Sequence, residues 1–174
     1  MLWLKTVGIA CIISGFGGWG LNGAQNLERR VEQIKELRLA LGFLEKEVGS
    51  LYIPLSRALG RTAQFCKMPV AVLFSASARI LEAKAGATGS EAWMKGLEEL
   101  QHSSKLKKPE IELLAAAASQ LGMTDAAQQK KLLSLLQEEL GIMEAKALQE
   151  AEAGHKLWSY GGFMFGALIV LLLL

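Results

Sequence analysis

The charged side chains of this chain are confined almost wholly to its middle, and this segregation limits the folds that it can adopt. The 174 residues include 19 Lys and Arg and 17 Asp and Glu. Apart from Lys5, all of them lie between Glu28 and Lys156. The windows Thr6–Leu27 and Leu157–Leu174 contain none, and 51% of the whole chain is hydrophobic. Two apolar ends around a charged middle argue against a simple soluble globule.

The first uncharged window is long enough to cross a bilayer core, which takes roughly 20 apolar residues as a helix. Trp3 and Trp19 are 16 positions apart, or about 24 Å along a helix, so an indole would lie near each membrane interface. We therefore predict an N-terminal transmembrane helix over residues 1–24. The alternative is a cleaved signal peptide with Lys5 as its basic start, although no small-x-small cleavage site follows.

The second uncharged window ends the chain on four leucines. Its 18 residues span roughly 27 Å as a helix, close to the hydrocarbon thickness. Trp158 and Tyr160 mark its entry at the interface. We predict a C-terminal transmembrane helix over residues 157–174, and the alternative is a buried hydrophobic helix in a soluble core.

Small residues recur within both predicted spans, and they let helices approach closely in lipid. Ala10, Ser14 and Gly18 repeat every four residues and share one face, while Gly162 and Gly166 form a GxxxG pattern. These five residues are the candidate transmembrane packing positions. They predict packing of the spans on each other or on other membrane subunits, and they are compatible with a homo-oligomer.

Basic residues near the spans predict the orientation of the chain, because Lys and Arg are enriched on the cytoplasmic side. Only Lys5 precedes the first span, and no charged residue follows the second. The flanks that face the middle are basic, at Arg29, Arg30, Lys35, Arg38, Lys146 and Lys156. The middle is therefore expected in the cytoplasm and both termini outside. A cytoplasmic location also suits the two thiols, Cys11 and Cys66.

The middle, residues 25–156, reads as helix throughout, so the predicted fold class is all-α. The strongest periodic signal is an apolar stripe over seven turns of a first helix, with Asn26 as its N-cap. That stripe consists of Leu27, Val31, Ile34, Leu37, Leu41, Leu44, Val48 and Leu51. Five further helices are expected over residues 54–65, 70–85, 91–102, 109–121 and 125–156. Together they predict an antiparallel bundle of about six helices.

Local signals suggest where these helices begin and end. Pro109 suits a first helical position, and Gly122 suits the residue just after a helix. Asp125 with Gln128 resembles a capping box at the start of the sixth helix, whose stripe is expected at Leu132, Leu136, Leu140, Met143 and Ala147. Gly154 is the expected place for a bend.

The sequence assembles no recognisable catalytic, cofactor or metal site. His102 and His155 are far apart and lack nearby cysteine, and the Gly86–Ser90 loop has no following Lys-Ser/Thr for phosphate binding. The adjacent Glu pairs at 98–99 and 138–139 diverge by about 100° on a helix and cannot face each other. A formal charge of +2 gives no bulk attraction to nucleic acid. We therefore expect a protein that is not an enzyme and that uses no cofactor.

Several short segments, in this order and between two terminal spans, resemble the stage III sporulation protein AB family of endospore-forming bacteria. They are Leu37-Arg-Leu-Ala-Leu41, Leu44-Glu-Lys-Glu47, Pro54-Leu55 with Ala58-Leu59, Ala92-Trp93, and Leu121-Gly-Met-Thr-Asp125 with Gln128 or Gln129 and Lys130. The family's soluble domain is in turn similar to the cytoplasmic domain of type II secretion and type IV pilus platform proteins. The segment Pro54-Leu55-x-x-Ala58-Leu59 is the shared element.

This resemblance implies a non-enzymatic part of the channel complex that links mother cell and forespore. Its implied location is the mother-cell-derived membrane around the forespore, and its implied partners are a secretion-type ATPase and other channel membrane subunits. The candidate partner surface consists of Arg38, Pro54, Arg57 and Arg61. Two other functions remain open, a bitopic adaptor or holin-like protein and a membrane enzyme whose site needs a partner.

Overall fold

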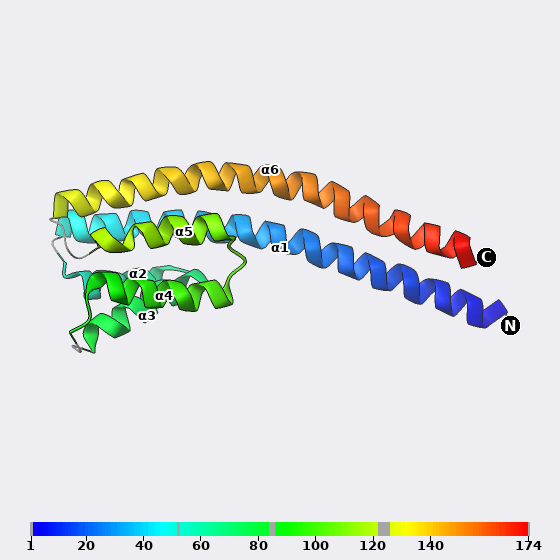
Figure 1. Ribbon diagram of the computed structural model, residues 1–174, viewed down its shortest axis with the longest axis horizontal. Coiled ribbons are helices and arrows are strands. Elements are labelled where there is room, and N and C mark those ends of the chain that lie inside the picture. Colours follow the sequence, from blue (N-terminus) through cyan, green and yellow to red (C-terminus); the bar gives the residue numbers. More distant parts are fainter. Residues whose placement is uncertain (1, 52, 84–85, 122–125, 174) are drawn as a thin grey trace. The chain divides into compact units, whose positions relative to one another are not determined.

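The computed structural model describes the backbone of residues 2–51, 53–83, 86–121 and 126–173 (Figure 1). Side chains are described within 22–154, apart from 24, 50–52, 84, 85 and 122–126, and at Met164. Over these ranges the chain forms six α-helices and one short 3-10 helix, with no strand. The helices are α1 (Leu2–Leu51), α2 (Leu55–Phe65), α3 (Val70–Glu82), α4 (Gly89–Ser103), α5 (Lys108–Ala116), η1 (Ala118–Gln120) and α6 (Ala126–Leu173). The prediction of six helices and an all-α fold is confirmed.

The chain divides into two compact units, one of residues 1–31 with 146–174 and one of residues 32–145. In the first unit, Arg30 Nη1 lies 2.7 Å from Glu150 Oε2 and Arg30 is only 5% exposed. The second unit, called the 32–145 unit below, contains most of the buried apolar side chains among those that are described. The predicted domain boundaries at 24/25 and 156/157 stay predictions.

No helix in the described part of the chain has an apolar stretch long enough to cross a membrane. The side chains of the predicted packing residues lie outside the described ones. These residues are Ala10, Ser14, Gly18, Gly162 and Gly166.

The apolar stripe of α1 forms one side of the core, as predicted. Its central residues, Ile34, Leu37, Leu41, Leu44 and Val48, are all buried. They recur at helical spacing, so one face of α1 is removed from water over about four turns.

The expected N-cap at Asn26 is wrong, because α1 continues through it from Leu2 to Leu51. Helix α6 likewise runs through Gly154 without a break, from Ala126 to Leu173, and the expected bend at Gly154 stays a prediction. Neither position is followed by a proline, and a single glycine costs a helix only about 1 kcal/mol. Nothing in the local sequence is strong enough to stop either helix.

The buried stripe of α6 begins one position away from the expected one. Leu133 is 1% exposed and Gln129 is 8% exposed, whereas Leu132 is only half-buried. Leu136 and Leu140 are buried as predicted. Gln129 extends the buried face by one turn. Because glutamine is polar, a search for apolar periodicity does not include this position.

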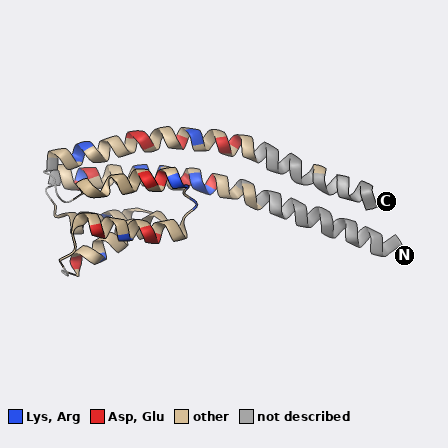
Figure 2. Cartoon of the chain, in the orientation of Figure 1, with Lys and Arg blue, Asp and Glu red and all other residues tan. Residues whose placement is uncertain are grey.

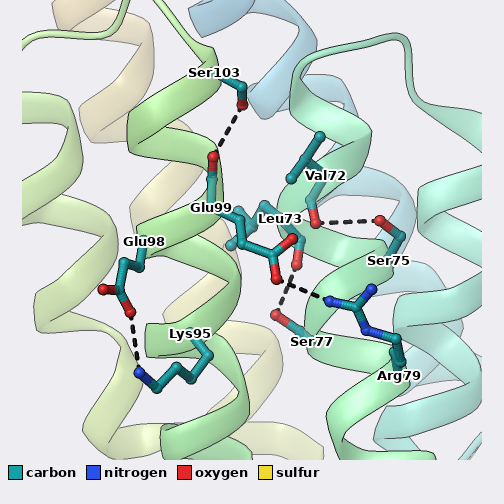
Figure 3. A network of polar contacts seen from close by, with 9 residues as sticks. All are labelled: Val72, Leu73, Ser75, Ser77, Arg79, Lys95, Glu98, Glu99 and Ser103. Carbon is teal, nitrogen blue, oxygen red and sulfur yellow. Dashed lines mark hydrogen bonds and ion pairs between the residues drawn. The ribbon is translucent and has the colours of Figure 1, made fainter.

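Helix α3 packs closely against both α2 and α4, through small residues. An alanine Cβ at Gly60 of α2 would lie 3.9 Å from Ala78 Cβ of α3, an ordinary contact. A Cβ at Gly96 of α4 would lie only 2.4 Å from both the Leu73 carbonyl oxygen and Ser77 Oγ of α3. Ser77 Oγ donates to the Leu73 carbonyl at 2.7 Å, so this buried hydroxyl is satisfied within its own helix (Figure 3).

Two helix boundaries differ from the predicted ones, and local hydrogen bonds explain the first of them. Helix α4 starts at Gly89, earlier than expected, because Thr88 is its N-cap. Thr88 Oγ1 accepts from Glu91 N at 3.2 Å and Thr88 N donates to Glu91 Oε2 at 2.9 Å, a complete capping box. Helix α3 ends at Glu82 rather than residue 85.

Helix α5 ends at Ala116 rather than Leu121, and η1 follows it. The Leu114 carbonyl, in the last turn of α5, accepts a hydrogen bond from Trp93 Nε1 at 2.8 Å. An indole from α4 thus satisfies a carbonyl that the end of a helix leaves open. Pro109 is the second residue of α5, one position after the predicted first position. Gly122 and Asp125, which carry the two other predicted boundary signals, lie outside the described residues.

Candidate partner-binding site

Helix α2 runs antiparallel along one side of α1, and three contacts fix its register. Arg61 pairs with Glu47, the rings of Phe65 and Phe43 stack with centroids 4.8 Å apart, and Lys67 N donates to Glu36 Oε1 at 2.8 Å. From the first contact to the third, the residue numbers rise on the α2 side and fall on the α1 side, so the two helices run in opposite directions. The register therefore places Pro54 and Arg57 toward the C-terminal end of α1.

Arg61 compensates a buried charge on α1. Its Nη1 atom lies 3.1 Å from Glu47 Oε2, in an ion pair whose angles are not those of a hydrogen bond. The Glu47 side chain is 6% exposed, while that of Arg61 is 51% exposed. Removing the partner of a buried carboxylate is strongly destabilising. Arg61 thus has a structural role, and its outer face is still accessible.

Arg38 lies on the other side of α1. Its Nη1 atom is 2.6 Å from Glu144 Oε2 of α6. Arg38 and Glu47 are nine positions apart, which is about 180° around a helix at 100° per residue. The contact of Arg38 with α6 and the contact of Glu47 with α2 therefore point in opposite directions.

The structure brings three of the four predicted surface residues together and places the fourth apart. Arg57 and Arg61 are four positions apart and share a face of α2, and exposed Pro54 directly precedes the helix. Arg57 is exposed and makes no ion pair with any residue whose side chain is described. Arg57 is accordingly the cation of this group that is available to a partner.

Charge sign alone does not mark a binding face on the 32–145 unit. Basic and acidic residues are interspersed along the described parts of α1 and α6 (Figure 2). Where α3 meets α4, the adjacent residues Glu98 and Glu99 turn to different partners, Lys95 at 3.1 Å and Arg79 at 2.8 Å (Figure 3). The expectation that these two carboxylates diverge is confirmed.

Within the described residues, no group of three or more His, Cys, Asp and Glu side chains could hold a metal ion. His102 is exposed at the end of α4, and the side chain of His155 is outside the described set. Glu138 and Glu139 are both exposed on α6, as expected for a solvated face.

The Cys66 thiol is held in its protonated form. Burial raises its pKa from 9.0 to about 12, and the nearby Glu36 carboxylate adds to the rise. A thiol attacks as its thiolate, so this environment suppresses nucleophilic reactivity. Because the folded thiol holds its proton more tightly than the unfolded one, it favours the folded state below about pH 9. That contribution is lost as the pH rises toward 12.

We expect Cys66 in the folded chain to react with iodoacetamide at pH 8 roughly 10³-fold more slowly than in urea, because the thiolate fraction falls with the raised pKa. Peptide mapping by mass spectrometry separates Cys66 from Cys11. Glu36→Gln should speed the folded-state reaction several-fold, since it removes the negative charge and keeps the acceptor for Lys67 N. A folded-state rate equal to the unfolded one would contradict this assignment.

Two features of the unit were not found from the sequence. Glu47 and Glu110 are buried carboxylates, at 4% and 0% exposure. Glu110 Oε2 accepts from Lys107 N at 2.8 Å, which the position of Glu110 in the first turn of α5 could have signalled. The second feature is a set of exposed apolar side chains beside the α1–α2 contact, with Leu39 and Phe65 each 53% exposed.

Comparison with known proteins agrees with the sequence resemblance. The model of the family Stage III sporulation protein AB matches residues 5–174. The chain belongs to this family. Stage III sporulation protein AB of Bacillus subtilis (strain 168) is 33% identical over 171 residues, which cover 98% of this chain and 99% of that protein.

A solved structure of Stage III sporulation protein AB (SpoIIIAB) is also similar, at 33% identity and a TM-score of 0.66. The match covers 71% of this chain and 97% of the solved one. Membership in the stage III sporulation protein AB family confirms the resemblance. Because the family match runs from residue 5 to residue 174, it includes both apolar ends as well as the 32–145 unit.

Proposed function

We propose that this protein is a membrane platform or scaffold component of the sporulation channel complex between mother cell and forespore. In this role it couples a cytoplasmic secretion-type ATPase to membrane subunits and performs no reaction itself. Family membership over residues 5–174 is the observation that carries the proposal. The similarity of Pro54-Leu55-x-x-Ala58-Leu59 to secretion platform domains supports the ATPase as the partner.

The bounds of the two long helices also suit a coupling role. Helices α1 and α6 each extend without a break from a segment predicted to span the membrane into the 32–145 unit. We propose a two-pass protein of the mother-cell-derived membrane, with residues 25–156 in the cytoplasm and both termini outside. A holin-like protein or simple adaptor needs no ordered core such as the one around Trp93 and Phe74, and this favours the scaffold.

Arg57→Glu is expected to reduce recovery of the ATPase with the full-length protein at least tenfold, which corresponds to about 1.4 kcal/mol. The reason is that an exposed arginine without a described ion pair becomes a like charge to an acidic partner surface. The measurement is quantitative co-purification from membranes of sporulating cells. Lys131→Glu is the matched control, because Lys131 is exposed on α6 and also lacks an ion pair among the described side chains. Equal recovery with Arg57→Glu and with the native protein would remove Arg57 from the docking surface.

A further inference from the structure

The Glu47 carboxylate of α1 is buried in a setting that contributes little to stability. Its side chain is 6% exposed, and its Oε2 atom accepts no hydrogen bond from any described residue. Its charge is offset by Arg61, whose Nη1 atom lies 3.1 Å away. The attraction within a buried ion pair roughly cancels the cost of removing its charges from water, unless hydrogen bonds satisfy the remaining lone pairs. The reason for a carboxylate at this position is therefore to be sought in what it does to Arg61.

Glu47 orders an arginine whose side chain otherwise extends into water. The Arg61 side chain is 51% exposed, and its contact with Glu47 is made through Nη1. A guanidinium presents five N–H donors in a planar fork, so one edge can face Glu47 while another faces water. A long side chain that is ordered before binding loses less conformational freedom when a partner arrives. Arg61 is thus held in a defined place with donors still available on its outer side.

A second arginine lies beside the first on α2. Arg57 is four positions earlier, so the Cβ atoms of the two arginines are about 5–6 Å apart on one helix face. Like charges at this spacing repel each other. Glu47 offsets one of the two charges, and α2 itself (Leu55–Phe65) contains no acidic residue. Counting these three side chains, the face keeps a net positive charge and two guanidinium groups, which bind carboxylates through paired N–H donors.

We propose that Glu47 is a positioning residue for partner docking. It holds the Arg61 guanidinium beside Arg57, and the two arginines together receive a carboxylate-bearing segment of the partner. The inference rests on the ATPase docking proposed above. It adds the chemistry of that contact, and it gives a role to a carboxylate that is buried beneath the contact.

Glu47→Gln tests the positioning role, because it keeps the size of the side chain and removes its charge. Recovery of the ATPase with the full-length protein from membranes of sporulating cells should fall by about threefold or more, since Arg61 is no longer ordered before binding. The urea midpoint for Cys66 alkylation should stay within about 0.5 M of the native value, because no buried charge is left unpaired. A purely structural role for Glu47 would give the reverse, a lower midpoint and unchanged recovery with the folded protein.

Two substitutions of Arg61 separate its charge from its shape. Arg61→Lys keeps a cation near Glu47 but loses the planar fork, so recovery should fall by about threefold or more at a nearly native urea midpoint. Arg61→Gln leaves the buried Glu47 carboxylate without its cation and should lower the midpoint by about 1 M urea or more. The pair is then asymmetric, because the fold needs Arg61 more than it needs Glu47.

A double variant shows whether Glu47 acts through Arg61. Adding Glu47→Gln to Arg61→Lys should reduce recovery no further than Arg61→Lys alone, since both changes act on the same contact. The matched control is Glu144→Gln, which breaks the pair with Arg38 at 2.6 Å on the other side of α1. This control should leave recovery of the ATPase unchanged.

Three results would overturn the inference. They are native recovery with Glu47→Gln, an equal loss with Glu144→Gln, and additive losses in the double variant. If Arg57→Glu lowers recovery in the same preparations while Glu47→Gln does not, the proposed docking surface stands and the positioning role falls. Absence of the ATPase from the native preparation would overturn both.

Discussion

Gly96→Ala is expected to lower the free energy of unfolding of the 32–145 unit by about 3 kcal/mol. Overpacking of a filled core costs roughly 1–3 kcal/mol, and more where backbone must move. Here the added Cβ would lie 2.4 Å from the Leu73 carbonyl oxygen and equally close to Ser77 Oγ. Helices α3 and α4 must separate, or the buried Ser77 hydroxyl must leave its acceptor. The gain of about 1 kcal/mol in helix propensity offsets only part of this loss.

The measurement is the urea dependence of Cys66 alkylation in the full chain, because Cys66 lies in this unit and becomes reactive on unfolding. A loss of this size should lower the midpoint by about 1–2 M urea. Gly60→Ala is the matched control, since its Cβ would meet only Ala78 Cβ at 3.9 Å. It should be neutral or stabilising by up to about 1 kcal/mol. Adding Ser77→Ala to Gly96→Ala should restore only part of the stability, because the Leu73 carbonyl remains. A Gly96→Ala midpoint equal to that of Gly60→Ala would show that α3 and α4 are not this close.

Trp93→Ala is expected to lower the free energy of unfolding of the 32–145 unit by about 4 kcal/mol, which is within the usual range for truncating a buried tryptophan. The indole is 1% exposed and packs edge-on against Phe74, with centroids 5.9 Å apart. Its Nε1 atom also donates to the Leu114 carbonyl at the end of α5. The variant therefore leaves a cavity and an unpaired carbonyl in the same place.

Two further variants separate these contributions in the same alkylation assay. Trp93→Phe keeps a ring in the core but removes the hydrogen bond. It should lower the free energy of unfolding by about 1–2 kcal/mol beyond the effect of the smaller side-chain volume. Met94→Ala is the matched control, because Met94 is the next residue along the chain and is 45% exposed. Its free energy of unfolding should stay within about 0.5 kcal/mol of the native value. If Trp93→Ala unfolds at the same urea concentration as Met94→Ala, the indole does not join α4 to α5.

Periodicity predicted the helices well because it reports burial directly. The stripe from Ile34 to Val48 is buried as expected, Pro54 directly precedes α2, and Pro109 is the second residue of α5. Proline restricts the backbone locally, so its effect can be seen from the sequence alone.

The misplaced boundaries have different causes. The start of α4 follows from the local capping box of Thr88 and Glu91, which the sequence search missed. Near the end of α5, the Leu114 carbonyl accepts from an indole of α4, 21 positions earlier, a contact that the local sequence does not reveal. The cap expected at Asn26 failed because a favourable N-cap residue does not by itself interrupt a helix that can continue.

The partner surface was predictable only in part, for a geometric reason. Arg57 and Arg61 share a face because both belong to one short helix. Arg38 belongs to another helix, and the side of α1 that meets α2 emerges only from the Glu47–Arg61 and Phe43–Phe65 contacts.

The most direct test of the central proposal is affinity purification of the full-length native protein from cross-linked membranes of sporulating cells, with identification of what accompanies it. The platform account predicts recovery of a secretion-type ATPase together with membrane subunits of the channel, at levels well above those from a mock purification. Repeated recovery of neither the ATPase nor any channel subunit, from membranes in which both are present, would contradict the account.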